Sequence, residues 1–283
     1  MGLGAEELQI WKEVDGIFTA DPRKVKSARL ISIITPEEAS ELTYYGSEVI
    51  HPFTMEQVIR AHIPIRIKNV QNPRGQGTVV FPTDSVSKDG TATPPHSPKV
   101  LAENGYHLDL SRKYPTAVTI KDSLVVLNVH SNRKSVSHGF FAKIFSTLDR
   151  YGIVVDLIST SEVHVSMALG ADSNERDLPR VIEDLKSVGR VDLLRNMAIL
   201  SLVGKQMKNM VGIAGMMFTT LASAGVNIEM ISQGASEINI SCVIEESKAV
   251  TAMNVIHDQL LSKQSTLVLP AVKQSTIASL MLD

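Results

Sequence analysis

Residues 139–159, GFFAKIFSTLDRYGIVVDLIS, and residues 212–232, GIAGMMFTTLASAGVNIEMIS, follow the same plan twice along this chain. Each stretch begins with a glycine, continues as a helical pattern that ends at a second glycine, and then becomes rich in β-branched residues. The positions that are identical in both copies are Gly139/Gly212, Phe145/Phe218, Thr147/Thr220, Leu148/Leu221, Gly152/Gly225, Ile158/Ile231 and Ser159/Ser232. A repeat at a fixed period indicates a duplicated structural unit. It favours paired ligand-binding modules over one continuous catalytic core.

Further strand and helix patterns extend each copy. Polar and apolar residues alternate over 162–169, which predicts a strand with one covered face, and 237–244 takes the same place in the later copy. Helices are predicted over 177–188 and 247–261, and strands over 117–129, 191–194, 198–203 and 266–269. Each unit then has the order strand–helix–strand–strand–helix–strand, the ferredoxin-like βαββαβ plan. We expect the first unit at residues 115–197 and the second at 198–275.

The residues before the repeat have a different character. Short apolar runs alternate with helical patterns over 8–82, and TPEE at 35–38 is typical of a helix start, with threonine as N-cap and proline at the first helical position. This alternation favours an α/β domain in which helices cover strands. Residues 83–99 carry almost no apolar side chains, so we expect a linker over 83–114. The predicted fold class is a partial α/β domain followed by two α+β units.

Composition excludes several classes of function. The 28 basic and 30 acidic residues give a net charge of −2, which leaves no electrostatic footprint for nucleic acid. There is no apolar run long enough to span a membrane and no signal peptide pattern, so no membrane partner is expected. Cys242 is the sole cysteine, which precludes an internal disulfide and favours a cytoplasmic location. We expect it to be buried and inert. The histidines lack metal-ligand spacing, and no metal site is predicted.

The segment WKEVDGIFTADPR at residues 11–23 is the most specific stretch of the chain. Its Asp-Gly and Asp-Pro dipeptides predict turns that present backbone at a surface. Arg23 suits a phosphate, because the guanidinium group matches phosphate oxygens in geometry. The alternative is an ordinary loop with a solvated arginine, and the residues alone leave both interpretations open.

This segment, together with YYGSEVIHP at 44–52 and IRIKN at 65–69, resembles the C-terminal part of the kinase domain of aspartokinases. The double repeat resembles the two ACT domains that follow it in that family, and the polar linker resembles fungal members. The resemblance covers nearly all of residues 8–270. It implies that residues 1–82 are the C-terminal remnant of an amino-acid-kinase domain, so that the chain begins in the middle of a fold.

The resemblance also implies a nucleotide site, whose residues here are Lys12, Glu13, Phe18, Arg23, Glu48 and Val49. Many relatives have a lysine in place of Glu48, which leaves a phosphate contact there open. The family's Lys-Phe-Gly-Gly-Thr-Ser and Gly-Arg-Gly-Gly-Ser-Asp motifs, which hold its catalytic lysine and aspartate-binding residues, do not occur in this chain. Phosphoryl transfer depends on positioning and charge stabilisation by such residues. We therefore assign no catalytic residue and expect no kinase activity from this chain alone.

The repeats carry a chemistry of their own. Residues 132–139 form a loop that opens a helix, and the backbone N–H groups of Gly139, Phe140 and Phe141 at its positive end suit a carboxylate. Asp156 on the next strand could hold an ammonium group, with Ser161 and Glu162 near the side chain of the ligand. Alternatively, Gly139 only starts the helix and Asp156 is a solvated strand residue.

The resemblance places the amino-acid effector of aspartokinases at these positions, between ACT units of a dimer. The predicted effector residues are Ser137, Gly139, Phe140, Phe141, Val155, Asp156, Ser161 and Glu162, with Asn227, Ile228 and Gln233 in the later copy. Glu229 stands there in place of Asp156. The later copy either binds a ligand differently or only completes the sheet, and we favour the structural role.

The activity that the resemblance implies is transfer of phosphate from ATP to L-aspartate, giving 4-phospho-L-aspartate in the first step of lysine, threonine and methionine synthesis. ATP with Mg²⁺ would serve the intact enzyme, and no cofactor is expected to be tightly bound by this part. The chain is then the regulatory half, with threonine favoured over lysine as effector and a homo-oligomer formed through the ACT domains. The alternative is a stand-alone, dimerising amino-acid-sensing module without catalysis.

Overall fold

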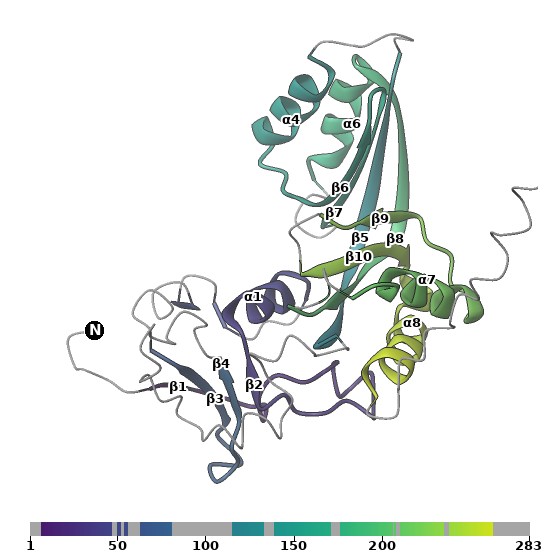
Figure 1. The fold of residues 1–283 in the computed structure, drawn as a ribbon. Coiled ribbons are helices and arrows are strands. Elements are labelled where there is room, and N and C mark those ends of the chain that lie inside the picture. Colours follow the sequence, from purple (N-terminus) through teal and green to yellow (C-terminus); the bar gives the residue numbers. More distant parts are fainter. Residues whose placement is uncertain are drawn as a thin grey trace, which may run out of the picture.

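The computed structural model describes residues 7–46, 50–51, 54–55, 63–80, 115–132, 139–170, 176–205, 207, 210–234 and 238–262. Its first part is a four-stranded mixed sheet in the order β1-β3-β4-β2 (Figure 1). The strands are β1 (Leu8–Lys12), β2 (Ile33–Ile34), β3 (Ile65–Asn69) and β4 (Thr78–Val80). Strand β1 runs parallel to β3, and β2 runs parallel to β4. Helix α1 (Pro36–Tyr44) follows β2, as the sequence predicts, and begins with a capping box of Thr35 and Glu38.

The second part is one six-stranded antiparallel sheet in the order β6-β7-β5-β8-β10-β9. Its strands are β5 (Ala117–Ser131), β6 (Val155–Ser161), β7 (His164–Gly170), β8 (Gly189–Val203), β9 (Met230–Ser232) and β10 (Asn239–Glu245). Helices α4 (Phe140–Arg150) and α6 (Leu178–Lys186) cover one end, and α7 (Ile213–Ser223) and α8 (Ala249–Ile256) cover the other (Figure 1). The 3-10 turn η3 (Glu246–Lys248) precedes α8, and the π-helical turn η4 (His257–Leu261) continues it.

Two long strands belong to both units at once. The second half of β5 pairs with the first half of β8, and Ala117–Lys121 pairs with Ile199–Val203. Ser123 and Asn196 interrupt these strands with positive φ values of 58° and 57°, close to shifts in their register. The first unit therefore uses the later half of β5, and the second unit takes the earlier half of β5 as its fourth strand.

This connectivity differs from the one expected from the sequence. Residues 191–194 and 198–203, predicted as two strands, form the continuous strand β8, so that the expected boundary at 197/198 falls inside it. The expected closing strand at 266–269 lies outside the described residues, and residues 117–121 lie next to β8 in the second unit. Periodicity along the chain could not reveal this arrangement, because a strand's partner is chosen by packing between distant segments. The linker predicted over 83–114 also lies outside the described residues.

Separate apolar clusters fill the two faces of the long sheet. Ile144, Val165 and Leu185 belong to the cluster beneath α4 and α6, and the cluster beneath α7 and α8 contains Met217 and Cys242. A third cluster lies on the face opposite these four helices. It joins Tyr45, which directly follows α1, to Leu157 of β6 and Met230 of β9. The two equivalent edge strands of the repeat therefore meet beneath the end of α1.

The N-terminal part is joined to the second unit through a shared core. Ala20 and Val25 lie in the cluster beneath α7 and α8, and Ala117 and Val203 lie in the core of the N-terminal sheet. The backbone N–H of Val118 donates to the carbonyl of Thr19 at 2.9 Å. Among the described helices, none is long and apolar enough to cross a membrane.

Candidate functional site

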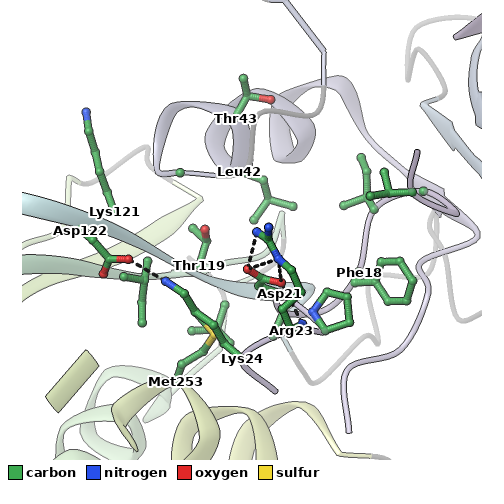
Figure 2. A pocket seen from close by; sticks show the side chains of 18 of the residues that line it. Phe18, Asp21, Arg23, Lys24, Leu42, Thr43, Thr119, Lys121, Asp122 and Met253 are labelled. Atoms are coloured by element: carbon green, nitrogen blue, oxygen red, sulfur yellow. Dashed lines mark hydrogen bonds and ion pairs between the residues drawn. The ribbon is translucent and has the colours of Figure 1, made fainter. Parts of the chain in front are cut away.

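A cleft of about 810 Å³ opens where the segment that follows β1 meets α1 and the start of β5 (Figure 2). Three of the predicted nucleotide-site residues, Lys12, Phe18 and Arg23, line it. Glu13 is exposed and is not among the lining residues, and Glu48 and Val49 lie outside the described residues. The further lining residues include Lys24, Thr43, Tyr44, Lys121 and Asp122.

Hydrogen bonds to the neighbouring strands hold the segment 15–23 in place. The N–H of Ile17 donates to the hydroxyl of Thr78 at 2.8 Å, and this hydroxyl donates to the carbonyl of Ile31 at 2.6 Å. Gly16 has a φ of 144°, and an added Cβ would lie 2.4 Å from the Thr78 hydroxyl. Only glycine therefore allows the turn to lie this close to β4.

Ion pairs order the basic side chains of the cleft. The Arg23 guanidinium donates to both carboxylate oxygens of Asp21, and this pairing lowers the pKa of Asp21. Lys24 lies 2.6 Å from the Asp122 carboxylate (Figure 2). Four cationic side chains and two carboxylates thus line the cleft, an arrangement that suits the phosphates of a nucleotide better than a cationic ligand.

The residues that reach the cleft from outside the 11–23 segment were not predicted from the sequence. Lys24 directly follows Arg23, and its charge is a signal that the sequence offered. Lys121 and Asp122 lie on β5, almost a hundred residues further along, and no local pattern connects them with the cleft.

A glycine in the left-handed conformation precedes α4, at the helix end that was predicted to bind a carboxylate. Gly139 adopts the left-handed conformation with a φ of 81°, and an added Cβ there would meet no described residue within 4 Å. Phe140 is buried in the core of the unit, whereas Phe141 is exposed. Ser137 lies outside the described residues. The described residues thus leave the position of a Cβ at Gly139 unfilled, and residues 133–138 lie outside them.

Asp156 is a buried ion-pair partner and not the solvated strand residue that was the alternative. Its side chain is 7% exposed, and its Oδ1 lies 2.6 Å from the ammonium group of Lys121. Its Oδ2 is buried and has no hydrogen-bond partner among the described residues. The neighbouring Val155 is half-buried at the beginning of β6, where the register with β7 shifts.

Ser161 and Glu162 lie at the opposite end of β6 from Asp156. Ser161 ends the strand, and Glu162 lies in the two-residue turn to β7, which begins at His164 and not at 162 as predicted. Five residues of extended strand separate Asp156 from Ser161, or roughly 16 Å. One small amino acid cannot contact both within a single chain.

The equivalent residues of the second unit have a different environment. Glu229 is exposed and accepts a hydrogen bond from the amide of Asn227 at 2.6 Å. Ile228 is half-buried, and Gln233 is exposed. The helix start at Gly212 has the same left-handed backbone as Gly139, with a φ of 86°. The repeat thus preserves the backbone but not the buried carboxylate.

The remaining titratable groups offer neither a metal site nor a reactive thiol among the described residues. The described residues contain no group of three or more His, Cys, Asp or Glu that could hold a metal ion. Burial raises the pKa of the Cys242 thiol to about 12, in agreement with the predicted inert cysteine.

Comparison with known proteins relates the two parts of the chain to two protein families. Residues 2–69 match the amino acid kinase family, and residues 200–260 match the ACT domain. The chain is 63% identical to the aspartokinase of Schizosaccharomyces pombe, over 92% of this chain and 50% of that protein. The chain therefore spans about half the length of the curated relatives that it matches.

Solved structures of aspartate kinases superpose on most of this chain. The aspartate kinase of Clostridium acetobutylicum superposes with a TM-score of 0.78 at 28% identity, over 91% of this chain and 55% of that one. E. coli aspartokinase III, described in complex with aspartate and ADP as the R-state, gives 0.74 at 29% identity, over 92% and 53%. The same enzyme with lysine and aspartate, its T-state, gives 0.71 at 28% identity, over 92% and 53%. The expected fold class, a partial amino-acid-kinase-type domain followed by two ferredoxin-like ACT units, is confirmed.

Proposed function

This chain is a homologue of the aspartokinases that spans about half of their length, and from that premise we propose that it is the regulatory half of an aspartate kinase. In this proposal the first ACT unit binds a feedback amino acid, and the N-terminal part contributes one wall of the nucleotide site. The whole enzyme would transfer phosphate from ATP to L-aspartate.

The observation that carries the proposal is the buried carboxylate of Asp156, one oxygen of which has no hydrogen-bond partner among the described residues. A buried acceptor without a donor is costly, and the ammonium group of an amino acid would satisfy it. The N–H groups at the start of α4 would supply the complementary site for a carboxylate, and they lie towards the Ser161 end of β6, because the end of β5 that leads into α4 is aligned with it. They would therefore bind one zwitterionic amino acid together with Asp156 only across a dimer, with Val155 beside the ammonium group.

The extent of β6 supports a dimer as the form that binds the effector. Residues 158–161 are exposed on an edge strand of the described sheet, and such an edge pairs readily with a second chain. Antiparallel pairing of two copies of β6 about a two-fold axis would bring Ser161 and Glu162 of one copy towards Asp156 of the other. A complete site is then formed only between two chains.

The identity of the effector is proposed from the relatives. Threonine is favoured because the chain resembles fungal aspartokinases, among them the enzyme of Saccharomyces cerevisiae, which is 61% identical. Lysine is the second candidate, and E. coli aspartokinase III has been solved with it. In the second unit, Asn227, Ile228 and Gln233 would have a structural role, since Glu229 is exposed.

The cleft lined by Lys12, Phe18 and Arg23 would hold the phosphates of ATP, which would arrive as its magnesium complex. Glu48 and Val49 would extend the same site. This chain alone would have no kinase activity, because it contains neither the catalytic lysine motif nor the aspartate-binding motif of the family. The single buried cysteine supports a cytoplasmic location.

A stand-alone amino-acid sensor is the second candidate function. The described residues form both βαββαβ units, with β5 supplying a strand to each, and an ACT pair of this kind could bind an effector by itself. The two candidates differ in whether catalysis in the whole protein responds to the effector.

Calorimetry of this chain with threonine and with lysine tests the proposal. We expect binding that Asp156→Asn abolishes and that the matched substitution Glu229→Gln leaves within about twofold of the unchanged chain. Equal losses in both variants would refute the assignment to the first unit. An ATP- and aspartate-dependent hydroxamate assay tests catalysis in parallel, and turnover by this chain would contradict the proposed lack of activity.

A further inference from the structure

Lys121 connects two sites that the sequence keeps apart. Its ammonium group lies 2.6 Å from Oδ1 of Asp156, the proposed effector carboxylate. It also lies 5.6 Å from the centre of the Tyr44 ring, at the end of α1. Both Lys121 and Tyr44 line the cleft that contains Lys12, Phe18 and Arg23. The side chain of Lys121 therefore contacts β6, helix α1 and the cleft.

The two oxygens of Asp156 have unequal surroundings. Lys121 occupies Oδ1, whereas Oδ2 is buried without a partner among the described residues. A second ammonium group at Oδ2 would share the carboxylate with Lys121, and the two like charges would repel each other within a few ångströms. A cation that binds at Oδ2 should therefore weaken the ion pair between Asp156 and Lys121.

We propose that Lys121 is a positioning residue that competes with the amino group of the effector for Asp156 and transmits its occupancy to helix α1. This inference rests on the proposed function and assigns a mechanism to its regulatory site. When an amino acid binds, the ion pair with Asp156 weakens and Lys121 moves away from its position above Tyr44.

Contacts at the end of α1 would transmit this movement of Lys121 to other parts of the molecule. Tyr45 is buried in the cluster that joins Leu157 of β6 to Met230 of β9. Its carbonyl accepts a hydrogen bond from the Thr119 hydroxyl at 3.0 Å, two residues before Lys121. Burial raises the pKa of the Tyr44 phenol, and the carboxylates of Asp156 and Glu41 raise it further, so Tyr44 already lies within the field of the effector carboxylate.

Two substitutions of Lys121 have opposite expected effects. Lys121→Met keeps the apolar stem and removes the competing charge, so the effector should bind about tenfold more tightly. Lys121→Arg offers a planar fork that can engage both oxygens of Asp156, so binding should weaken by about fivefold or more. The arginine variant keeps the buried carboxylate paired and tests the proposal even where the methionine variant does not fold.

The experiment is calorimetry of the whole chain with threonine and with lysine, combined with hydrogen exchange of residues 36–46. Effector should change exchange at the end of α1 in the unchanged chain and not in Lys121→Met. Lys68→Met is the matched control, because Lys68 also lies over an aromatic ring, that of Trp11 at 5.1 Å, and takes no part in either site.

The outcomes separate this inference from the proposed function. Binding that Asp156→Asn abolishes, but that neither Lys121 variant alters, would overturn the role of Lys121 and leave the effector site standing. An unchanged exchange at residues 36–46 on saturation would overturn transmission to α1. A chain that binds neither amino acid would overturn the proposed function and this inference together.

Discussion

The ring Nε2 of His257 lies 2.9 Å from the hydroxyl of Thr19, so that the last turn of the second unit is joined to the loop that forms the cleft. Its Nδ1 lies 3.2 Å from the Ser27 hydroxyl, and the Thr19 hydroxyl also accepts the backbone N–H of Arg29. The His257 side chain is 1% exposed. It lies in η4, a π-helical turn, a type that occurs often at functional positions.

His257 should make stability depend on pH. Burial lowers its pKa below the unfolded value of about 6.5, so the unfolded chain binds protons more readily. The contribution is complete above pH ~6.5 and is lost as the pH falls through the folded pKa. Urea unfolding at several pH values should show a steeper acid loss for the unchanged chain than for His257→Gln. Parallel curves would contradict this, and the half-buried His164, whose pKa is also lowered, is common to both proteins.

Glu38 should stabilise the junction between the N-terminal part and the long sheet more than any other carboxylate of the described residues. It is 1% exposed and accepts hydrogen bonds from the Thr116 hydroxyl at 2.5 Å and from the N–H of Lys205 at 2.9 Å, besides those of its capping box. Glu38→Ala should lower the free energy of unfolding by about 2–4 kcal/mol, because several buried donors lose their acceptor. Glu37→Gln, one residue away and exposed, should change it by less than about 0.5 kcal/mol.

Gly46 should not tolerate a side chain. Its φ is 109°, and an added Cβ would lie 2.2 Å from the carbonyl oxygen of Ile120. Gly46→Ala should therefore cost about 2–5 kcal/mol through backbone strain and overpacking. Gly225→Ala is the comparison, since φ there is 66° with open space around the Cβ, and it should cost about 1–2 kcal/mol. Thermal unfolding of both variants measures these costs. Equal losses of stability would show that the backbone of β5 at Ile120 moves to make room for the new side chain.

Cys242 should react only when the second unit opens. The thiol is buried in β10, and its raised pKa of about 12 leaves almost no thiolate at neutral pH. A colorimetric disulfide reagent at pH ~8 should therefore label the unfolded chain at once and the native chain at the rate of unfolding. Rapid labelling of the native chain would indicate that the α8 side of the sheet opens locally.

Several features of the candidate sites followed from local sequence. The segment 11–23 predicted the loop that lines the cleft, because turn dipeptides and Arg23 are neighbours in the chain. The duplicated pattern predicted both helix starts, and Gly139 and Gly212 have nearly the same left-handed backbone. The chemistry proposed for these residues stays a prediction.

Other features depended on residues that are distant in sequence. Ser161 and Glu162 were grouped with Asp156 because they are near in sequence, yet an extended strand places them at opposite ends of β6. Lys121 was not anticipated, since nothing near it in sequence indicates that its ammonium group faces Asp156 and Tyr44. Glu229 resembles Asp156 in the repeat, but its exposure separates the two.

The sequence by itself determined the repeat, the alternation of helices and strands along each copy and the resemblance to a family, because hydrophobic periodicity and turn chemistry are local properties. Only the tertiary structure decided that β5 and β8 serve both units, and that Lys121 lies between β6 and the cleft. The physical reason is that strand pairing and ion pairing join residues far apart in the chain, and their energies depend on which surfaces are buried together.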